Sequence, residues 1–214
     1  MKPLNHSGPF ETDSMKPFPV LRPVPDYLQD SERMFQGVPS ITSSPGGRLW
    51  VAWDTGDVTE GDENAAVVGS SGDGGNTWSS PLFAIDQPGP LRVIDPGMWT
   101  DPDGRVWLFY AQSYSFWDGR AGVWAMNPED PEREQTAWSD PRRLCDGFLK
   151  NKPIVRSDGA WLLPTEFSNF PPRSGTTMHN LAHFTGPLAH PGAALQAANV
   201  FISHDKGNTV EFLG

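Results

Sequence analysis

The stretch Ser71-Gly72-Asp73-Gly74-Gly75-Asn76-Thr77-Trp78 decides the fold. Asp73 can accept hydrogen bonds from the backbone amides of its own turn, and the glycines supply the positive φ angles that a tight turn needs. Thr77 and Trp78 are expected to begin the next strand, with the indole packed on a neighbouring sheet. The pattern returns as Ser203-His204-Asp205-Lys206-Gly207-Asn208-Thr209-Val210. Two copies of one turn predict a repeated β-structure.

The chain also repeats itself over longer distances. Three prolines, each expected to begin an apolar strand, follow one another at intervals of 57 residues: Pro39, Pro96 and Pro153. Each is followed by a turn and an aromatic strand, at residues 46–53, 103–110 and 158–163. Third strands are expected at residues 65–70 and 122–126. A unit of this length with several strands is typical of a β-propeller blade.

We therefore predict an all-β fold, a β-propeller built of four-stranded antiparallel blades. The partial propeller should occupy residues 31–214, with blades at about 33–90, 91–147 and 148–214, and with an insertion at 168–198 in the third. The proline-rich arm at residues 1–30 is expected to lie on the first blade or to be disordered. Trp50, Trp107 and Trp161 should occupy equivalent places around the shared axis.

Composition excludes several classes of protein and partner. The net charge is −10 and there is no run of Lys or Arg, so neither nucleic acid nor an anionic membrane is an expected partner. Cys145 is the single cysteine, so an internal disulfide is impossible, and a small buried apolar role is expected. Residues 1–10 lack the apolar core of a signal peptide, and no apolar run could cross a bilayer. These features predict a soluble chain of undetermined location.

The first unit offers a cluster of carboxylates. In a propeller, the innermost strands and the loops at one end of the axis carry the site, and turns like residues 71–78 lie at the other end. Arg33, Asn64 and an acidic loop come from this unit; the loop holds Asp54, Asp57, Glu60, Asp62 and Glu63. A carboxyl group among like charges has a raised pKa, which suits a general acid. Glu60 and Glu63 are expected to face the channel, and the alternatives are a solvated loop or a cation site.

The second and third units offer mixed charges. Arg92, Asp95 and Gln112 belong to unit two, together with Trp117, Asp118 and Arg120. An aromatic ring beside a carboxylate and a guanidinium can stack a sugar and hold its polar groups, and the alternative is a turn with an internal ion pair. Unit three contributes Asp146, Lys150, Asn151, Lys152 and Glu166. The His179 and His183 pair lacks a third ligand, so no metal site is expected there.

The pattern S-x-D-x-G-x-T-W at residues 71–78 is the Asp box, or BNR repeat, and the chain resembles the sialidase (neuraminidase) superfamily over about residues 33–214. Further matching elements are Q-G-V-P-S at 36–40, E-G-D-E-N at 60–64, D-G-R-A-G-V-W at 118–124 and N-K-P at 151–153. The resemblance implies a six-bladed propeller. The chain is therefore expected to be the N-terminal half of a longer protein, or half of a ring that another chain completes. The family is often secreted or periplasmic.

The resemblance also implies an activity, the removal of a terminal, acidic sugar from glycans or polysaccharides by an exo-acting glycoside hydrolase. Such enzymes use an Asp as acid/base and a Tyr–Glu pair as nucleophile. Gly37 stands where the family has its first arginine, which leaves Arg33, Arg92 and Arg120 as candidates to replace it. Tyr27, Tyr110 and Tyr114 match no nucleophile motif, so a truncated chain is expected to hold only part of the site.

The expected roles can be assigned residue by residue. The catalytic candidates are Glu60, Glu63 and Asp118, and the substrate-binding candidates are Arg33, Asn64, Arg92, Asp95, Gln112, Trp117, Arg120 and Lys152. Carbohydrate is the expected partner, and neither a cofactor nor a metal is expected. Two rival hypotheses stand beside the hydrolase: a non-catalytic propeller that binds glycan or protein, and a polysaccharide lyase on a related propeller.

Overall fold

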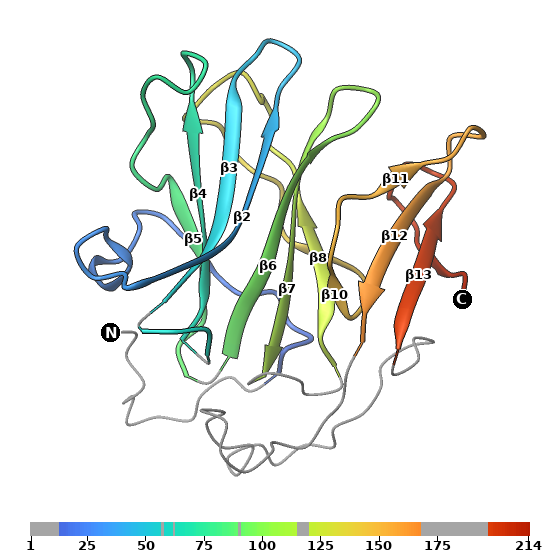
Figure 1. The fold of residues 1–214 in the computed structure, drawn as a ribbon, viewed down its shortest axis with the longest axis horizontal. Helices are drawn as coiled ribbons and strands as arrows, with labels where there is room; N and C mark the ends of the chain where they lie inside the picture. Colours follow the sequence, from blue (N-terminus) through green and yellow to red (C-terminus); the bar gives the residue numbers. More distant parts are fainter. Residues whose placement is uncertain (1–12, 57, 62, 90, 115–119, 168–196) are drawn as a thin grey trace.

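The computed structural model describes residues 13–56, 58–61, 63–89, 91–114, 120–167 and 197–214, which form three antiparallel sheets side by side (Figure 1). We call the sheets blades 1, 2 and 3. Blade 1 contains β1 (Val20–Leu21), β2 (Phe35–Ser43), β3 (Leu49–Gly56), β4 (Ala65–Ser71) and β5 (Phe83–Ile85) in the order β1-β5-β4-β3-β2. A short 3-10 helix, η1 (Asp26–Leu28), precedes β2. The all-β prediction is confirmed.

Blade 2 has four strands, and blade 3 has an inner strand in two pieces. Blade 2 contains β6 (Leu91–Thr100), β7 (Val106–Tyr114), β8 (Gly122–Met126) and β9 (Arg142–Asp146) in chain order. Blade 3 contains β10 (Phe148–Leu149), β11 (Ile154–Val155), β12 (Trp161–Glu166), β13 (Ala198–Ser203) and β14 (Glu211–Phe212). Both β10 and β11 pair with β12. Blades 1 and 3 therefore differ from the predicted four-stranded form, because each has one additional short strand.

The repeated prolines mark bulges in the innermost strands. The prediction that each proline begins its strand is wrong for Pro39 and Pro96, because β2 begins at Phe35 and β6 at Leu91. It holds for Pro153, which directly precedes β11. The pairing shifts register between Gly37 and Ser40 in β2, and between Ile94 and Gly97 in β6. Proline has no N–H to donate, so a bulge is one of the few places inside a strand where it fits.

The residue before each of these two prolines has an unusual backbone. Val38 has φ 44° and Asp95 has φ 51°, both in the left-handed region that side chains other than glycine rarely adopt. In blade 3 the corresponding stretch, residues 150–153, separates β10 from β11. Each inner strand thus bends at its proline, and the bend turns local side chains away from the regular alternation of the strand.

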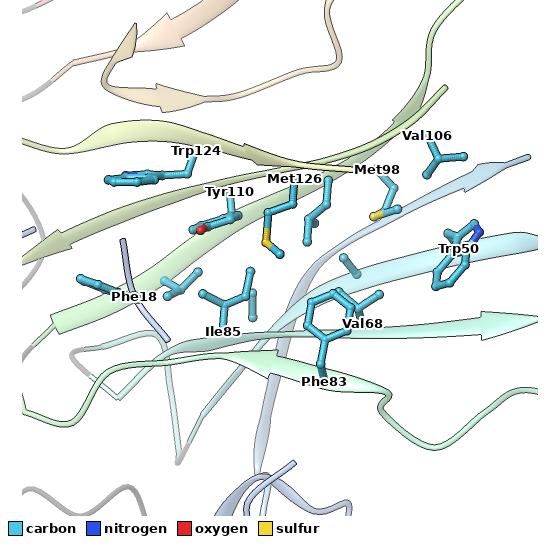
Figure 2. Packing of buried hydrophobic residues seen from close by; sticks show 14 of the residues in the cluster. Phe18, Trp50, Val68, Phe83, Ile85, Met98, Val106, Tyr110, Trp124 and Met126 are labelled. Atoms are coloured by element: carbon cyan, nitrogen blue, oxygen red, sulfur yellow. The ribbon is translucent and has the colours of Figure 1, made fainter. Parts of the chain in front are cut away.

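Blades 1 and 2 bury one apolar core between their faces. Figure 2 shows Trp50, Phe83 and Ile85 of blade 1 opposite Met98 and Tyr110 of blade 2. All of these side chains are buried, and Phe18 of the N-terminal segment closes one end of the cluster. The Trp50 indole also donates from Nε1 to the carbonyl of Pro131, at 2.8 Å, in the loop between β8 and β9. Trp50 therefore faces the blade that follows its own.

The second core lies between blades 2 and 3, and it corrects one prediction. Trp107 meets Trp161 edge to face, with ring centroids 5.4 Å apart. Trp107 thus faces the following blade, as Trp50 does, whereas Trp161 faces the preceding one. The hairpin turns explain the difference. In each turn one carbonyl accepts the backbone N–H that closes the turn, and these carbonyls belong to Arg48, Arg105 and Ala160. Trp50 and Trp107 stand two residues after the carbonyl of their turn, whereas Trp161 stands only one residue after it.

The three tryptophans therefore do not occupy equivalent places. Side chains alternate between the two faces of a strand, so a shift of one residue reverses the face. Leu162 holds the place in β12 that corresponds to Trp50 and Trp107. The repeat itself persists, because the turn hydrogen bonds and the strand order recur in all three blades.

The N-terminal segment is tied to blades 1 and 2. Strand β1 pairs with β5 and so extends the first sheet. Val24 and Leu28 pack on Ala65, Val67 and Ala84. The N-terminal segment thereby covers the face of blade 1 that points away from blade 2. Residues 1–12 lie outside the described part of the chain. No helix among the described residues is long and apolar enough to cross a membrane.

Cys145 lies in the core between blades 2 and 3, as a small buried residue. Burial, together with repulsion from Asp146, raises the pKa of its thiol to about 12, although Arg143 acts in the opposite direction. A thiol in this state is a poor nucleophile at neutral pH. The predicted role as a buried apolar residue is confirmed.

The two Asp-box turns have the same hydrogen bonds. Asp73 accepts from the Thr77 amide at 2.9 Å, from the Thr77 hydroxyl at 2.7 Å and from the Ser71 hydroxyl at 2.8 Å. Asp205 has the corresponding bonds with Thr209 and Ser203. Trp78 does not begin a strand as predicted, because β5 begins only at Phe83. Its indole is 46% exposed and lines a shallow apolar groove with Ile41, Val51 and Trp53.

We expect the Asp-box carboxylates to resist protonation. The Thr77 amide, then the hydroxyls of Thr77 and Ser71, lower the pKa of Asp73 to about 2, and the bonds from Thr209 do the same for Asp205. The ordinary value in an unfolded chain is about 3.9. The stabilisation from these bonds is therefore complete above about pH 4 and is lost as the pH falls through about 2. Carboxyl ¹³C shifts followed from pH 5 to pH 1.5 measure both midpoints.

A single variant serves as the control for that titration. Thr77→Val removes one hydroxyl donor from Asp73 and leaves the second turn intact. The midpoint of Asp73 should rise towards its ordinary value, while that of Asp205 stays unchanged. Midpoints near 4 for both aspartates in the parent chain would contradict the expected bonding.

Candidate functional site

Strand connections alternate between the two ends of the blades. The β2–β3 and β6–β7 turns lie at the top of Figure 1, as do the Asp-box turns that follow β4 and β13. The β3–β4 loop therefore lies at the opposite end, where β6 begins. The acidic loop and the start of β6 meet there, at the end where a site was expected.

An ion pair joins the acidic loop to β6. Arg92 Nη2 lies 2.9 Å from Glu60 Oε1. The Arg92 side chain is fully buried, whereas that of Glu60 is 48% exposed. A guanidinium taken out of water needs such a carboxylate, because burying an unpaired charge is costly. The pair therefore fixes the acidic loop of blade 1 against blade 2.

A second ion pair joins blade 2 to blade 3. Lys150 Nζ lies 2.6 Å from Asp95 Oδ2 and 3.6 Å from Glu166 Oε2. Burial disfavours the charge of Lys150, but the hydrogen bond and attraction of Asp95, followed by those of Glu166, outweigh it and raise the pKa of this lysine. Lys150 is therefore a cation throughout the physiological range, with nearly half of its side chain exposed.

Asp54 connects these two pairs. Its side chain is fully buried, and Oδ2 accepts the backbone N–H of Asp95 at 3.3 Å. Burial first, and repulsion by Asp95 second, raise the pKa of Asp54 to about 8, although the Asp95 N–H and Arg92 lower it. Asp54 is thus largely protonated at neutral pH. We call the set Asp54, Glu60, Arg92, Asp95, Lys150 and Glu166 the charged cluster.

A cleft of about 300 Å³ opens where the three inner strands bend. Its walls include Val38 and Pro39 of blade 1, Asp95 and Pro96 of blade 2, and Lys150 and Lys152 of blade 3. Asp95 and Lys150 belong to the charged cluster as well, so the cluster forms part of the cleft wall. The volume is that of a small-ligand site, and oxygen and nitrogen atoms of both charge signs line it.

The predicted site residues divide into two groups. Glu60, Arg92, Asp95 and Lys152 lie in the charged cluster or in the cleft wall. Lys152 donates from Nζ to the carbonyl of Ile41 at 2.7 Å, which links blade 3 to blade 1. Glu63 is half-buried in the loop before β4.

Other predicted residues have structural contacts of their own. Asn64 closes the acidic loop, because its Oδ1 accepts the Gly61 N–H at 2.5 Å. Gln112 donates to the carbonyls of Ser14 and Lys16, and thereby holds the N-terminal segment.

Two arginines lie against other parts of the chain. Arg120 lies 3.6 Å from Asp13, again at the N-terminal segment. Arg33 pairs with Asp30 and lies over the Trp53 ring. Trp117, Asp118 and the His179 and His183 pair lie outside the described residues. Within the described part of the chain, no group of three or more His, Cys, Asp and Glu side chains could hold a metal ion.

Three members of the cluster were not singled out from the sequence. Asp54 was placed in the acidic loop, but β3 continues to Gly56, so Asp54 is a strand residue. Lys150 and Glu166 were noted only as members of unit three, and their contact with Asp95 depends on how blades 2 and 3 pack. The signal for Asp54 was its place after Trp53 in a strand of alternating burial, which predicts an inward carboxyl.

Comparisons with known proteins agree with the fold. The family described as "BNR repeat-like domain" matches residues 47–209. A Hadza microbial sialidase is 17% identical, with a TM-score of 0.58 over 86% of this chain and 38% of its own. A protein of unknown function from Dyadobacter fermentans is 14% identical, with a TM-score of 0.54 over 86% of this chain and 55% of its own. Among curated proteins no sequence matches. The chain thus spans about two fifths to just over half of these solved structures, and the likeness is one of fold.

Proposed function

The chain belongs to the BNR repeat-like domain family, and from this premise we propose that it contributes the cleft-bearing half of a sialidase-like exo-glycoside hydrolase. The substrate is a terminal, acidic sugar of a glycan or polysaccharide. Blades at about residues 33–90, 91–147 and 148–214 form this half, and further blades or another chain complete the ring.

The cleft between the three bent strands carries the proposal. It presents the Lys150 ammonium group, which is nearly half exposed, next to the Asp95 carboxylate. Such a pair suits a sugar acid, because the ammonium binds the sugar carboxylate while the aspartate accepts hydrogen bonds from its hydroxyl groups. Lys152 adds a second cation to the same wall.

The acid/base role is assigned within the acidic loop and the β7–β8 loop. Glu60, Glu63 and Asp118 remain the candidates, since each is placed by the sequence at this end of the blades. A general acid protonates the leaving oxygen of the glycosidic bond, and its conjugate base later activates water. Glu60 has the additional task of holding Arg92, at 2.9 Å.

A second candidate function is supported by the tyrosines. Tyr27 donates from its hydroxyl to Asp86 at 2.8 Å, and Tyr110 is buried in the core between blades 1 and 2. Neither faces the cleft, so neither is placed as a nucleophile. Among the tyrosines whose side chains the structure describes, none therefore offers a nucleophile to the cleft, which favours the rival reading, a non-catalytic glycan-binding propeller.

Binding of simple sugars tests the cleft. We expect N-acetylneuraminate or galacturonate to bind more tightly than galactose, since only the sugar acids offer a carboxylate to Lys150. Lys150→Met should weaken the binding of the acids about ten- to a hundredfold, because a charge-assisted hydrogen bond contributes about 1.5–3 kcal/mol. Isothermal titration calorimetry measures each affinity, and release of a terminal sugar from sialyl or uronic-acid glycans reports turnover.

The matched control is a lysine at the far end of the blades. Lys206 is a residue of the second Asp-box turn and pairs with Asp103 at 2.6 Å, so Lys206→Met should leave the affinity unchanged. Equal affinity for acidic and neutral sugars, or equal effects of the two substitutions, would refute a sugar-acid site here. Binding without turnover by the chain and by its longer forms would favour the non-catalytic reading.

A further inference from the structure

The buried carboxyl of Asp54 is not required by the fold. Asp54 pairs with Gly37 just before the bulge of β2, and Ala111 pairs with Ile94 just before the bulge of β6. Ala111 is therefore the corresponding residue of blade 2, and it packs in an apolar cluster with Ile94, Ala121 and Phe148. A small apolar side chain is evidently sufficient at this place in a blade. Burying a carboxyl group instead opposes folding, which suggests that Asp54 has a task other than packing.

The contacts of Asp54 indicate what that task is. Its Oδ2 accepts the backbone N–H of Asp95, at 3.3 Å, across the boundary between blades 1 and 2. Asp95 is the bulge residue with φ 51°, in the left-handed region, which costs free energy for a residue other than glycine. Because the bulge interrupts the pairing of β6 with β7 at Asp95, the N–H of Asp95 takes its acceptor from Asp54 of the neighbouring blade.

The position of Asp95 decides what the cleft offers to a ligand. Its side chain forms part of the cleft wall and receives Lys150 Nζ at 2.6 Å. A change of φ at Asp95 would move both the carboxylate and the lysine that it holds. Asp54 lies behind this wall and is fully buried, so it can act on a ligand only through Asp95.

We propose that Asp54 is a positioning residue, which holds Asp95 and through it Lys150 in the arrangement that binds a sugar acid. This inference rests on the proposed function of the cleft. The geometry that carries it is the bond from a buried side chain of one blade to the strained bulge of the next. Asp54 takes no part in the reaction itself.

The protonation of Asp54 gives the inference a signature in pH. The charged groups that act on Asp54 are the carboxylates of Asp95 and Glu60 and the guanidinium of Arg92. With its pKa raised to about 8, Asp54 is neutral below that pH and does not repel Asp95. As the pH rises through about 8, Asp54 becomes an anion that still accepts the Asp95 N–H but repels the Asp95 carboxylate, so the place of this carboxylate beside Lys150 should shift. Sugar-acid affinity is therefore expected to decline between pH 7 and pH 9.

Two substitutions separate the role of the acceptor from that of the proton. Asp54→Asn keeps an oxygen that accepts the Asp95 N–H but cannot ionise, so its affinity for galacturonate should stay within about twofold of the parent at pH 7 and show no decline up to pH 9. Asp54→Ala removes the acceptor, and its affinity should fall about tenfold at both pH values. The control is Asp86→Asn, which changes a buried aspartate that accepts a hydrogen bond from Tyr27. This variant should keep the decline of sugar-acid affinity between pH 7 and pH 9.

A readout without ligand keeps the inference separate from the proposed function. The ¹H–¹⁵N amide signal of Asp95 should titrate with a midpoint near pH 8 in the parent chain and stay constant in Asp54→Asn. If no sugar acid binds to any form, the proposed function fails, and the amide titration still decides whether Asp54 positions Asp95. An Asp95 amide that does not titrate, or an Asp54→Ala chain that binds as tightly as the parent, overturns the inference.

Discussion

Replacing Trp107 with alanine is expected to lower the free energy of unfolding by about 3–5 kcal/mol. The Trp107 ring is almost fully buried between blades 2 and 3. It stacks on Phe109 with centroids 5.6 Å apart, meets Trp161 edge to face, and donates from Nε1 to Asp101 Oδ2 at 2.9 Å. The substitution leaves a large cavity and an aspartate oxygen without its donor, and both effects oppose folding.

Urea unfolding followed by far-ultraviolet circular dichroism measures this loss. Trp78→Ala is the matched control, because the same side chain is removed from a site that is 46% exposed, so less apolar area is lost from the core and the expected loss is smaller. Trp107→Phe should fall between the two, at about 1–2 kcal/mol, since a ring remains in the core but the bond to Asp101 is gone. Equal losses for Trp107→Ala and Trp78→Ala would mean that blades 2 and 3 do not share this core.

Local turns account for the part of the fold that was predictable. The serine, aspartate, glycine and threonine of each Asp box bond within eight residues, so the sequence alone specifies both turns. The turn glycines Gly47, Gly104 and Gly159 recur at nearly regular intervals, and all three have positive φ, which glycine adopts without strain. Hairpins follow from such turns, because each turn places its flanking strands side by side.

Pairings between distant residues account for the part that was not predictable. The bulges at Val38 and Asp95 depend on two strands losing register, and no residue type signals that directly apart from the proline that follows. Trp161 was misplaced because it stands one residue nearer to its hairpin turn than Trp50 and Trp107 do, and a shift of one residue reverses the face on which a side chain lies. An aromatic residue in the right stretch of sequence does not reveal its face.

The candidate site shows the same division. The acidic loop and Arg92 were predicted at one end of the blades, and their meeting at 2.9 Å follows from the order of the strands. Gln112 and Arg120 had the residue types of a sugar site, yet they hold the N-terminal segment, whose proline-rich sequence has no periodicity from which to predict a docking place. Lys150 and Asp95 were both named from the sequence, but their contact was not predicted, because they are 55 residues apart and lie in different blades.

The ion pair between Glu60 and Arg92 gives the second large expected effect. Glu60→Gln should lower the free energy of unfolding by about 3 kcal/mol, because it deprives a fully buried guanidinium of the carboxylate at 2.9 Å. We place the loss at the low end of the range for broken buried pairs, since half of the Glu60 side chain is exposed and water can replace part of its charge. Glu134→Gln is the control, because its pair with Arg48 is 3.8 Å long and Arg48 keeps its hydrogen bonds to the Glu132 carbonyl and the Ser70 hydroxyl, and a change below about 0.5 kcal/mol is expected.

A double-mutant cycle distinguishes the loss of an ion pair from the loss of an acidic side chain. Arg92→Met alone leaves Glu60 half in water, so its cost should be smaller than that of Glu60→Gln, and the double variant should recover about 1–2 kcal/mol relative to the sum of the two single losses. Chemical denaturation of the four chains at pH 7 measures the coupling.

The cycle also bears on Asp54, because Glu60 raises the pKa of that residue and Arg92 lowers it. Glu60→Gln should therefore move the Asp95 amide midpoint below 8 and Arg92→Met should move it above 8. Additive stability losses, with a midpoint that stays fixed in both variants, would show that the two charges are independent and that the cluster does not act as one unit.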